Sequence, residues 1–138
     1  MLRKEMNMNN HEIAMEAYFY AYNHTLYGGI SQKNAIKCYE QIIARMDSDE
    51  RLDLPFMTAL GNCYVATKKR LIKCSKSLFG YKFKELKWDQ INSISFDSTL
   101  TTGALLLDTV NGKIKISVHR DGAGYACQQL RKLKNATK

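Results

Sequence analysis

The stretch from Cys63 to Phe96 constrains the fold of this chain more than any other. Two six-residue arms, Cys63–Lys68 and Lys69–Cys74, are rich in β-branched and other apolar residues and meet at a cationic turn. Such arms suit a half-buried pleated surface. After the Gly80 turn, aromatic residues and lysines alternate over positions 81–84, which is typical of a strand with one face in water. The stretch therefore predicts three strands with tight connections, and then a short helical turn that leads into a fourth strand.

Two segments before this stretch are predicted to be helical. Asn10 can cap a first helix that ends at Gly28-Gly29, and apolar residues cover most of its circumference, so it needs two neighbours. Ser31 can cap a second helix over residues 32–46, with its apolar side chains on one face. Because the connection is short, we expect an antiparallel helical hairpin. The polar segment 47–50 then separates this hairpin, residues 1–50, from a second domain, residues 51–138.

The remaining segments predict further strands and one closing helix. Residues 52–60 fit a strand that Pro55 confines to an edge or a bulge. Trp88 is expected in the core on a single helical turn. Asn111-Gly112 is the strongest hairpin turn in the chain and joins predicted strands over 104–109 and 114–118. Asp121 can cap a last helix that runs to about residue 135.

The order of these elements resembles the bacterial pleckstrin-homology-like domains of the YokE type. Members of that family carry a Thr-x-(Lys/Arg)-Arg-Leu-Ile hairpin, which matches residues 67–72, and a Tyr/Trp-x-x-Ile-x-Ser-Ile segment, which matches residues 88–94. The resemblance covers residues 52–133. It implies an α+β fold in which an antiparallel PH-like β-roll is closed by a C-terminal helix, here preceded by the helical hairpin.

Composition favours a cytoplasmic protein without a cofactor. No apolar run approaches the ~20 residues of a membrane span, and the polar start lacks the apolar stretch of a signal peptide. The cysteines form no CxxC pair and the histidines are scattered, so we expect no metal site. If Lys68-Lys69 is a two-residue loop, Cys63 faces Cys74 across the hairpin. A disulfide is conceivable there, although two buried thiols fit a reducing cytoplasm better.

The net charge of +8 is unevenly distributed along the chain. Residues 1–50 carry 5 basic and 7 acidic groups, whereas residues 63–90 carry 8 basic and 2 acidic groups. This asymmetry favours either attraction to an anionic partner or docking of one part of the chain on the other. The candidate anion- or partner-binding residues are Lys68, Lys69, Arg70, Lys73, Lys76, Lys82, Lys84 and Lys87. The alternative is that these lysines are solvated and keep sheet edges from pairing.

A second candidate surface is aromatic. Tyr18, Tyr20, Tyr22 and Tyr27 can form a protein interface, because tyrosines often anchor such contacts. The alternative is that they pack between the second helix and the sheet. Catalysis is not expected, since no nucleophile elbow, phosphate-cradling glycine loop or paired-carboxylate motif occurs.

We therefore predict a non-enzymatic binding or adaptor protein that acts through protein–protein contacts of a PH-like domain. An alternative is an inhibitor of a host defence nuclease, encoded by a phage or mobile element and similar in action to an anti-CRISPR protein. A further alternative is peripheral binding to an anionic membrane or to nucleic acid through the basic face. Self-association is also compatible with the sequence.

Overall fold

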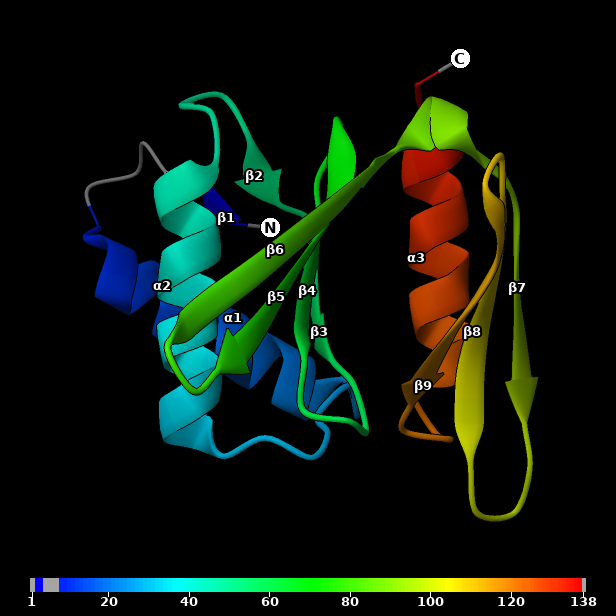
Figure 1. The fold of residues 1–138 in the computed structure, drawn as a ribbon, viewed down its shortest axis with the longest axis horizontal. Coiled ribbons are helices and arrows are strands. Elements are labelled where there is room, and N and C mark those ends of the chain that lie inside the picture. Colours follow the sequence, from blue (N-terminus) through cyan, green and yellow to red (C-terminus); the bar gives the residue numbers. More distant parts are fainter. Residues whose placement is uncertain (1, 4–7, 138) are drawn as a thin grey trace.

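Two antiparallel sheets form the centre of the computed structural model, which describes residues 2–3 and 8–137 (Figure 1). The first sheet has the order β3-β4-β5-β6 and the second has the order β7-β8-β9. Their bounds are β3 Leu54–Met57, β4 Cys63–Ala66, β5 Arg70–Ser77, β6 Gly80–Lys87, β7 Ile91–Ser98, β8 Gly103–Thr109 and β9 Gly112–Val118. A short pair, β1 (Leu2–Arg3) with β2 (Arg51–Leu52), lies apart from both sheets.

The two N-terminal helices pack on the first sheet, and the C-terminal helix packs mainly on the second (Figure 1). Helix α2 (Gln32–Arg45) packs on β5 and β4, and α1 (Asn10–Asn23) packs on α2 and β3. Helix α3 (Ala123–Asn135) packs mainly on β7, and also contacts β8 and β3. The predicted α+β fold, with antiparallel strands closed by a C-terminal helix, is therefore confirmed.

The register of the first hairpin follows the sequence pattern. Cys63 pairs with Cys74, and the amide of Thr67 donates to the carbonyl of Arg70 over 2.9 Å, which leaves Lys68 and Lys69 as the two-residue loop. The side-chain hydroxyl of Thr67 accepts hydrogen bonds from the amides of Lys69 and Arg70, which stabilises this otherwise unfavourable turn sequence. All four cysteines are free and buried, so no disulfide joins the pair.

The short helical turn that joins the sheets is also confirmed. Residues Trp88–Gln90 form a 3₁₀ turn, η1, and Trp88 and Ile91 are buried. The indole of Trp88 donates to the carbonyl of Thr67 over 2.9 Å, which ties this corner to the first hairpin. Strand β7 begins at Ile91, directly after this turn, and its pairing with β8 carries a register shift between Ile91 and Ser93.

Three predicted helix ends were wrong. Asn9, not Asn10, caps α1, because its side chain accepts from the amide of Glu12 within a capping box. That helix ends at Asn23 rather than at the glycine pair, and Thr25 turns the chain with a φ of 57°. Asp121 does not cap α3, whose N-cap is Gly122.

Both helices of the N-terminal hairpin contribute to the main core. Ile13 and Ala17 of α1 and Tyr39 and Ile42 of α2 are fully buried in the same cluster as the strand residues. Burial of this kind supplies most of the free energy that holds helices on a sheet. Helix α2 thus covers one face of the four-stranded sheet. Only the opposite face of that sheet can contact a partner.

Candidate functional site

A groove between the two sheets is the best candidate binding site. It encloses about 390 Å³ and is lined by β4, β5 and β6 on one side and by β9 on the other. The apolar lining residues are Tyr64, Leu71, Leu86, Ile114 and Ile116, and the charged ones are Lys73, Lys84 and Glu85. We call this feature the sheet groove. Its mixture of an apolar floor and a few charged groups is typical of recognition sites.

Strand register explains which lysines border the sheet groove. Lys73 of β5 pairs with Lys84 of β6, and Leu71 pairs with Leu86, so these four side chains share one face. Lys82 lies on that face too, because side chains two residues apart point the same way. The opposite face carries Phe83, over whose ring the Arg45 guanidinium of α2 lies at 3.7 Å. The three lysines therefore point away from α2.

These lysines lack intramolecular partners among the residues that the structure describes. No ion pair or hydrogen bond is formed by the ammonium groups of Lys73, Lys82 or Lys84 there. Lys73 is half-buried, whereas Lys82 and Lys84 are exposed. Two like charges directly opposite each other on neighbouring strands destabilise a sheet. We define Lys73, Lys82 and Lys84 as the lysine face.

The floor of the groove carries no negative charge at neutral pH. Tyr64 is only 8% exposed, and burial raises its pKa to about 12, so its phenol stays protonated. Its ring stacks on Phe56, with the ring centroids 4.9 Å apart. The one acidic lining residue, Glu85, is occupied by Arg70 at 2.6 Å. The groove is therefore electropositive at its rim.

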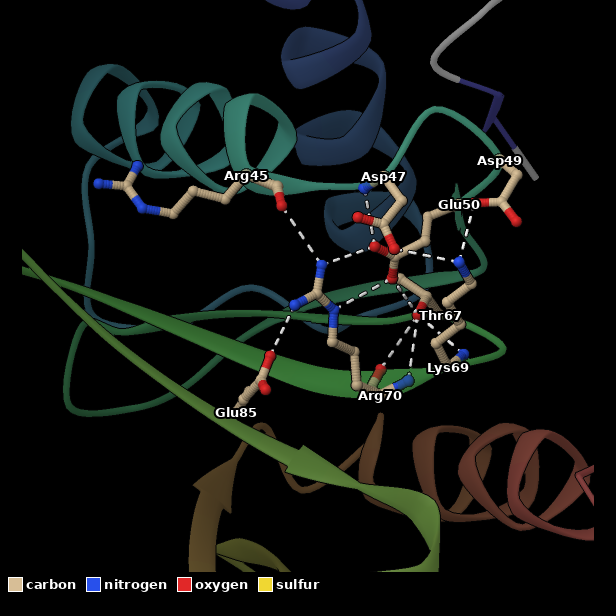
Figure 2. A network of polar contacts seen from close by, with 8 residues as sticks. All are labelled: Arg45, Asp47, Asp49, Glu50, Thr67, Lys69, Arg70 and Glu85. Atoms are coloured by element: carbon tan, nitrogen blue, oxygen red, sulfur yellow. Dashed lines mark hydrogen bonds and ion pairs between the residues drawn. The ribbon is translucent and has the colours of Figure 1, made fainter.

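Two cations of the first hairpin, Lys69 and Arg70, form ion pairs within the protein (Figure 2). The Arg70 guanidinium donates to both oxygens of the Glu50 carboxylate, at 2.6 and 3.2 Å, and reaches Glu85 with its other terminal nitrogen. The Lys69 ammonium lies 3.0 Å from Asp47 and 2.9 Å from Asp49. The acidic segment 47–50 thus pairs with Lys69 and Arg70, which docks one part of the chain on another.

Glu50 is the buried member of this network, with a side chain only 1% exposed. Burial alone would raise its pKa, but hydrogen bonds from Arg70, from the Asp47 amide and from Thr67 outweigh burial and lower the pKa. The hydrogen bonds to Glu50 and Glu85 raise the pKa of Arg70. The pair is therefore charged at neutral pH, and its role is to hold the segment after α2 against β5.

The other predicted basic residues lie elsewhere. Lys76 donates to the Asn34 side chain at the start of α2, on the covered face of the sheet. Lys68 is exposed in the hairpin turn, and Lys87 is exposed at the end of β6. The eight predicted cations therefore fall into separate groups, and the structure brings Lys73, Lys82 and Lys84 together beside a groove.

The predicted tyrosine surface is also divided. Tyr18 stacks on Tyr22, Tyr22 stacks on Tyr27, and Tyr27 contacts the His119 ring, which forms an aromatic row from α1 to the end of β9. Tyr22 is 52% exposed. Tyr20 points the other way and hydrogen-bonds to Tyr125 of α3. Three of the four tyrosines thus share a surface, and the fourth ties α1 to α3.

A second depression, of about 570 Å³, lies where the loop after α1 meets the ends of β8 and β9. Its lining includes Thr99, Thr102, Lys115 and Arg120. Arg120 donates to the Leu100 carbonyl at 2.6 Å and pairs with Asp121, so its charge is already engaged. The larger volume therefore offers less charge for recognition than the sheet groove does.

Residues 2–3 and 8–137 are the part of the chain for which metal-binding side chains can be described. Within these ranges no three His, Cys, Asp or Glu side chains are placed to hold a metal ion. The four cysteine side chains are fully buried, so no substrate reaches them. In the same part of the chain, no helix combines the length and apolar character required to cross a bilayer.

Sequence reasoning missed the apolar half of the candidate site. Leu71 and Leu86 belong to strands that the sequence predicts, and Ile114 and Ile116 belong to the predicted strand over 114–118. Nothing in local pattern shows that these two pairs line the same groove, because they come from different sheets. A signal did exist in the lysines, since the hairpin register alone places Lys73 opposite Lys84.

Comparison with known proteins gives one match. A family model described as "Bacterial PH domain" matches residues 30–132, which include α2 and both sheets. No curated protein and no solved structure matches the chain.

Proposed function

The chain belongs to the bacterial PH domain family, and from this premise we propose that it is a non-enzymatic protein that binds other proteins through the sheet groove. Domains of this kind generally bind rather than catalyse. The match of the hairpin over residues 67–72 and of the segment over 88–94 supports the YokE type within the family. Four free, buried thiols fit a reducing cytoplasm as the place where it acts.

One observation carries this proposal: the lysine face has no acidic partner within the described chain and borders an apolar groove. A solvated lysine needs no apolar neighbour, whereas a protein-binding site combines an apolar centre with a charged rim. An acidic partner would relieve the repulsion between Lys73 and Lys84 and would bury Leu86 and Ile114, which are only partly buried in the chain itself. Protein binding would therefore involve both the lysine face and the apolar lining of the groove.

A displayed library of random peptides tests the proposal. The wild-type chain is expected to enrich peptides that combine acidic and apolar residues, and the double variant Lys73→Glu, Lys84→Glu is expected to lose them. The matched control is Lys33→Glu, Lys37→Glu on α2, which makes the same change in net charge on exposed residues of another surface. Equal enrichment by wild type and the groove variant would contradict protein binding through the sheet groove.

Binding to an anionic surface is the second candidate function, favoured by the same unpaired lysines. It requires only positive charge, so it should fall off with rising ionic strength and should tolerate loss of the apolar floor. Vesicles that contain phosphatidylglycerol and a duplex DNA distinguish the two functions. If Leu86→Ala leaves vesicle or DNA binding unchanged and no peptide is enriched, the anionic surface is the partner.

A further inference from the structure

We infer that the outer edge of β6 receives an extended, acidic segment of a partner protein, which adds to the four-stranded sheet as a further antiparallel strand. This inference rests on the proposed function and states what kind of segment docks and how. Strand addition supplies affinity through main-chain hydrogen bonds and specificity through alternate side chains.

The backbone of β6 is available for such pairing. β6 is the terminal strand of its sheet, and among the described residues no backbone hydrogen bond reaches it from outside the β5–β6 ladder. In an antiparallel pair, alternate residues of an edge strand direct their N–H and C=O groups away from the ladder. β6 spans eight residues, so its free row is long enough for a paired strand.

The sheet groove determines what the added strand covers. Leu86 of β6 and Ile114 and Ile116 of β9 line the groove together, so β9 faces this region from the second sheet. A strand on β6 directs alternate side chains to that face, where the apolar ones contact these residues. One segment can therefore form hydrogen bonds with the edge of β6 and also bury apolar area in the groove.

Charge determines the sequence of the segment. Residues opposite Lys82 and Lys84 fall on the lysine face, so acidic side chains there meet two cations that have no partner among the described residues. Leu86 follows Lys84 by two residues in β6, and the partner residue opposite Leu86 is expected to be apolar. The segment therefore reads apolar-x-acidic-x-acidic in antiparallel pairing. On the other face the intervening positions lie opposite Phe83 and Glu85, neither of which attracts an acidic side chain.

The same charges make a second copy of this chain an unsuitable occupant. Antiparallel pairing of two β6 strands brings Lys82 and Lys84 of both copies onto one face, where like charges repel. Lysines on an edge strand commonly prevent such self-association. They leave the edge open to a segment of opposite charge.

The probe is a capped peptide of about nine residues in which Val, Glu and Glu occupy alternate positions and Thr fills the rest. Fluorescence anisotropy at low salt measures its binding to the full chain. We expect saturable binding that Lys84→Glu weakens about ten-fold or more, whereas Lys37→Glu changes it little. A second peptide carries N-methyl groups on the amides of one edge, and we expect it to lose binding because those donors pair with β6.

Each other outcome overturns the inference in a distinguishable way. If both peptides bind equally, recognition is by charge alone and strand addition is wrong, while protein binding stands. If a peptide with Lys in place of Glu binds equally well, the acidic preference is wrong. If neither acidic peptide binds and the Lys84-dependent ligand is an anionic vesicle or duplex DNA, then both the inference and the proposed function fail.

Discussion

Glu50 and Arg70 show that a basic residue in a cationic stretch can have a purely internal role. The guanidinium of Arg70 bridges two carboxylates, those of the buried Glu50 and of Glu85. Its neighbour Lys69 contacts Asp47 and Asp49 near the surface. The hairpin turn is thus bound to the segment that follows α2, and the charges of Lys69 and Arg70 are engaged within the protein.

Substitution of Arg70 by Ala tests this assignment. It leaves the Glu50 carboxylate buried without its cation, so we expect the free energy of unfolding to fall by about 2–4 kcal/mol. Urea denaturation followed by the fluorescence of the single tryptophan, Trp88, measures the change. Lys69→Ala is the control and should change stability little, because its carboxylate partners are exposed. Equal effects of the two substitutions would contradict a structural role specific to Arg70.

Acidification should weaken the same network. The pKa of Glu50 in the folded chain lies below its ordinary value of 4.5, so the folded state holds the unprotonated form more strongly than the unfolded state does. Its contribution to stability is therefore complete above pH 4.5 and is lost as the pH falls through the folded-state pKa. Urea denaturation of wild type and Glu50→Gln at a series of pH values should show a difference that shrinks below pH 4.5. A difference independent of pH would show that the carboxylate charge contributes nothing.

Among the elements, the loop after α1 requires glycine at positions 28 and 29 because a side chain there would clash with backbone atoms. A Cβ atom built on Gly28 would lie 1.9 Å from the Thr58 carbonyl oxygen, and the Gly29 amide donates to that oxygen over 3.0 Å. The glycine pair was predicted to end a helix, but the helix ends at Asn23. The pair is needed because the loop approaches the backbone after β3 closely.

Substitution of Gly28 by Ala should therefore separate these two segments. We expect a loss of roughly 1–3 kcal/mol, since the clash is with backbone and not with a flexible side chain. The control is Gly124→Ala in α3, where the nearest atom would be the Phe96 ring at 3.4 Å, an ordinary contact. That control should be neutral or slightly stabilising, because alanine favours a helix. Thermal unfolding of both variants decides the point, and an unchanged midpoint for Gly28→Ala would contradict the close approach.

Local pattern predicted the elements better than it predicted how they meet. The Thr67 hairpin, the Trp88 turn and the alternation along β6 follow from residues close in sequence, so their register was predictable. Alternation also separates Arg70 from Lys73, but the sequence could not show that α2 covers the Arg70 face or that Glu50, 20 residues away, pairs with Arg70. The sheet groove likewise combines β6 and β9, which no short-range signal connects.

At the scale of the whole molecule, the surfaces of this basic protein have different roles. The surface formed by α2 and the acidic segment 47–50 is structural, and the groove opposite α2 is proposed to bind. Because the lysine face is exposed at its rim, binding there should weaken as rising salt screens the charges. Binding through the aromatic row of Tyr18, Tyr22 and Tyr27 would depend much less on salt.

The most direct test is a map of the amide chemical shifts of the full chain as the acidic peptide is added. If the sheet groove is the binding site, the largest shifts will occur at residues 82–86 of β6 and 114–116 of β9, with small changes at 68–70 and 17–22. Largest shifts in the hairpin turn or on α1, with β6 and β9 unchanged, would contradict the claim that the sheet groove is the binding site.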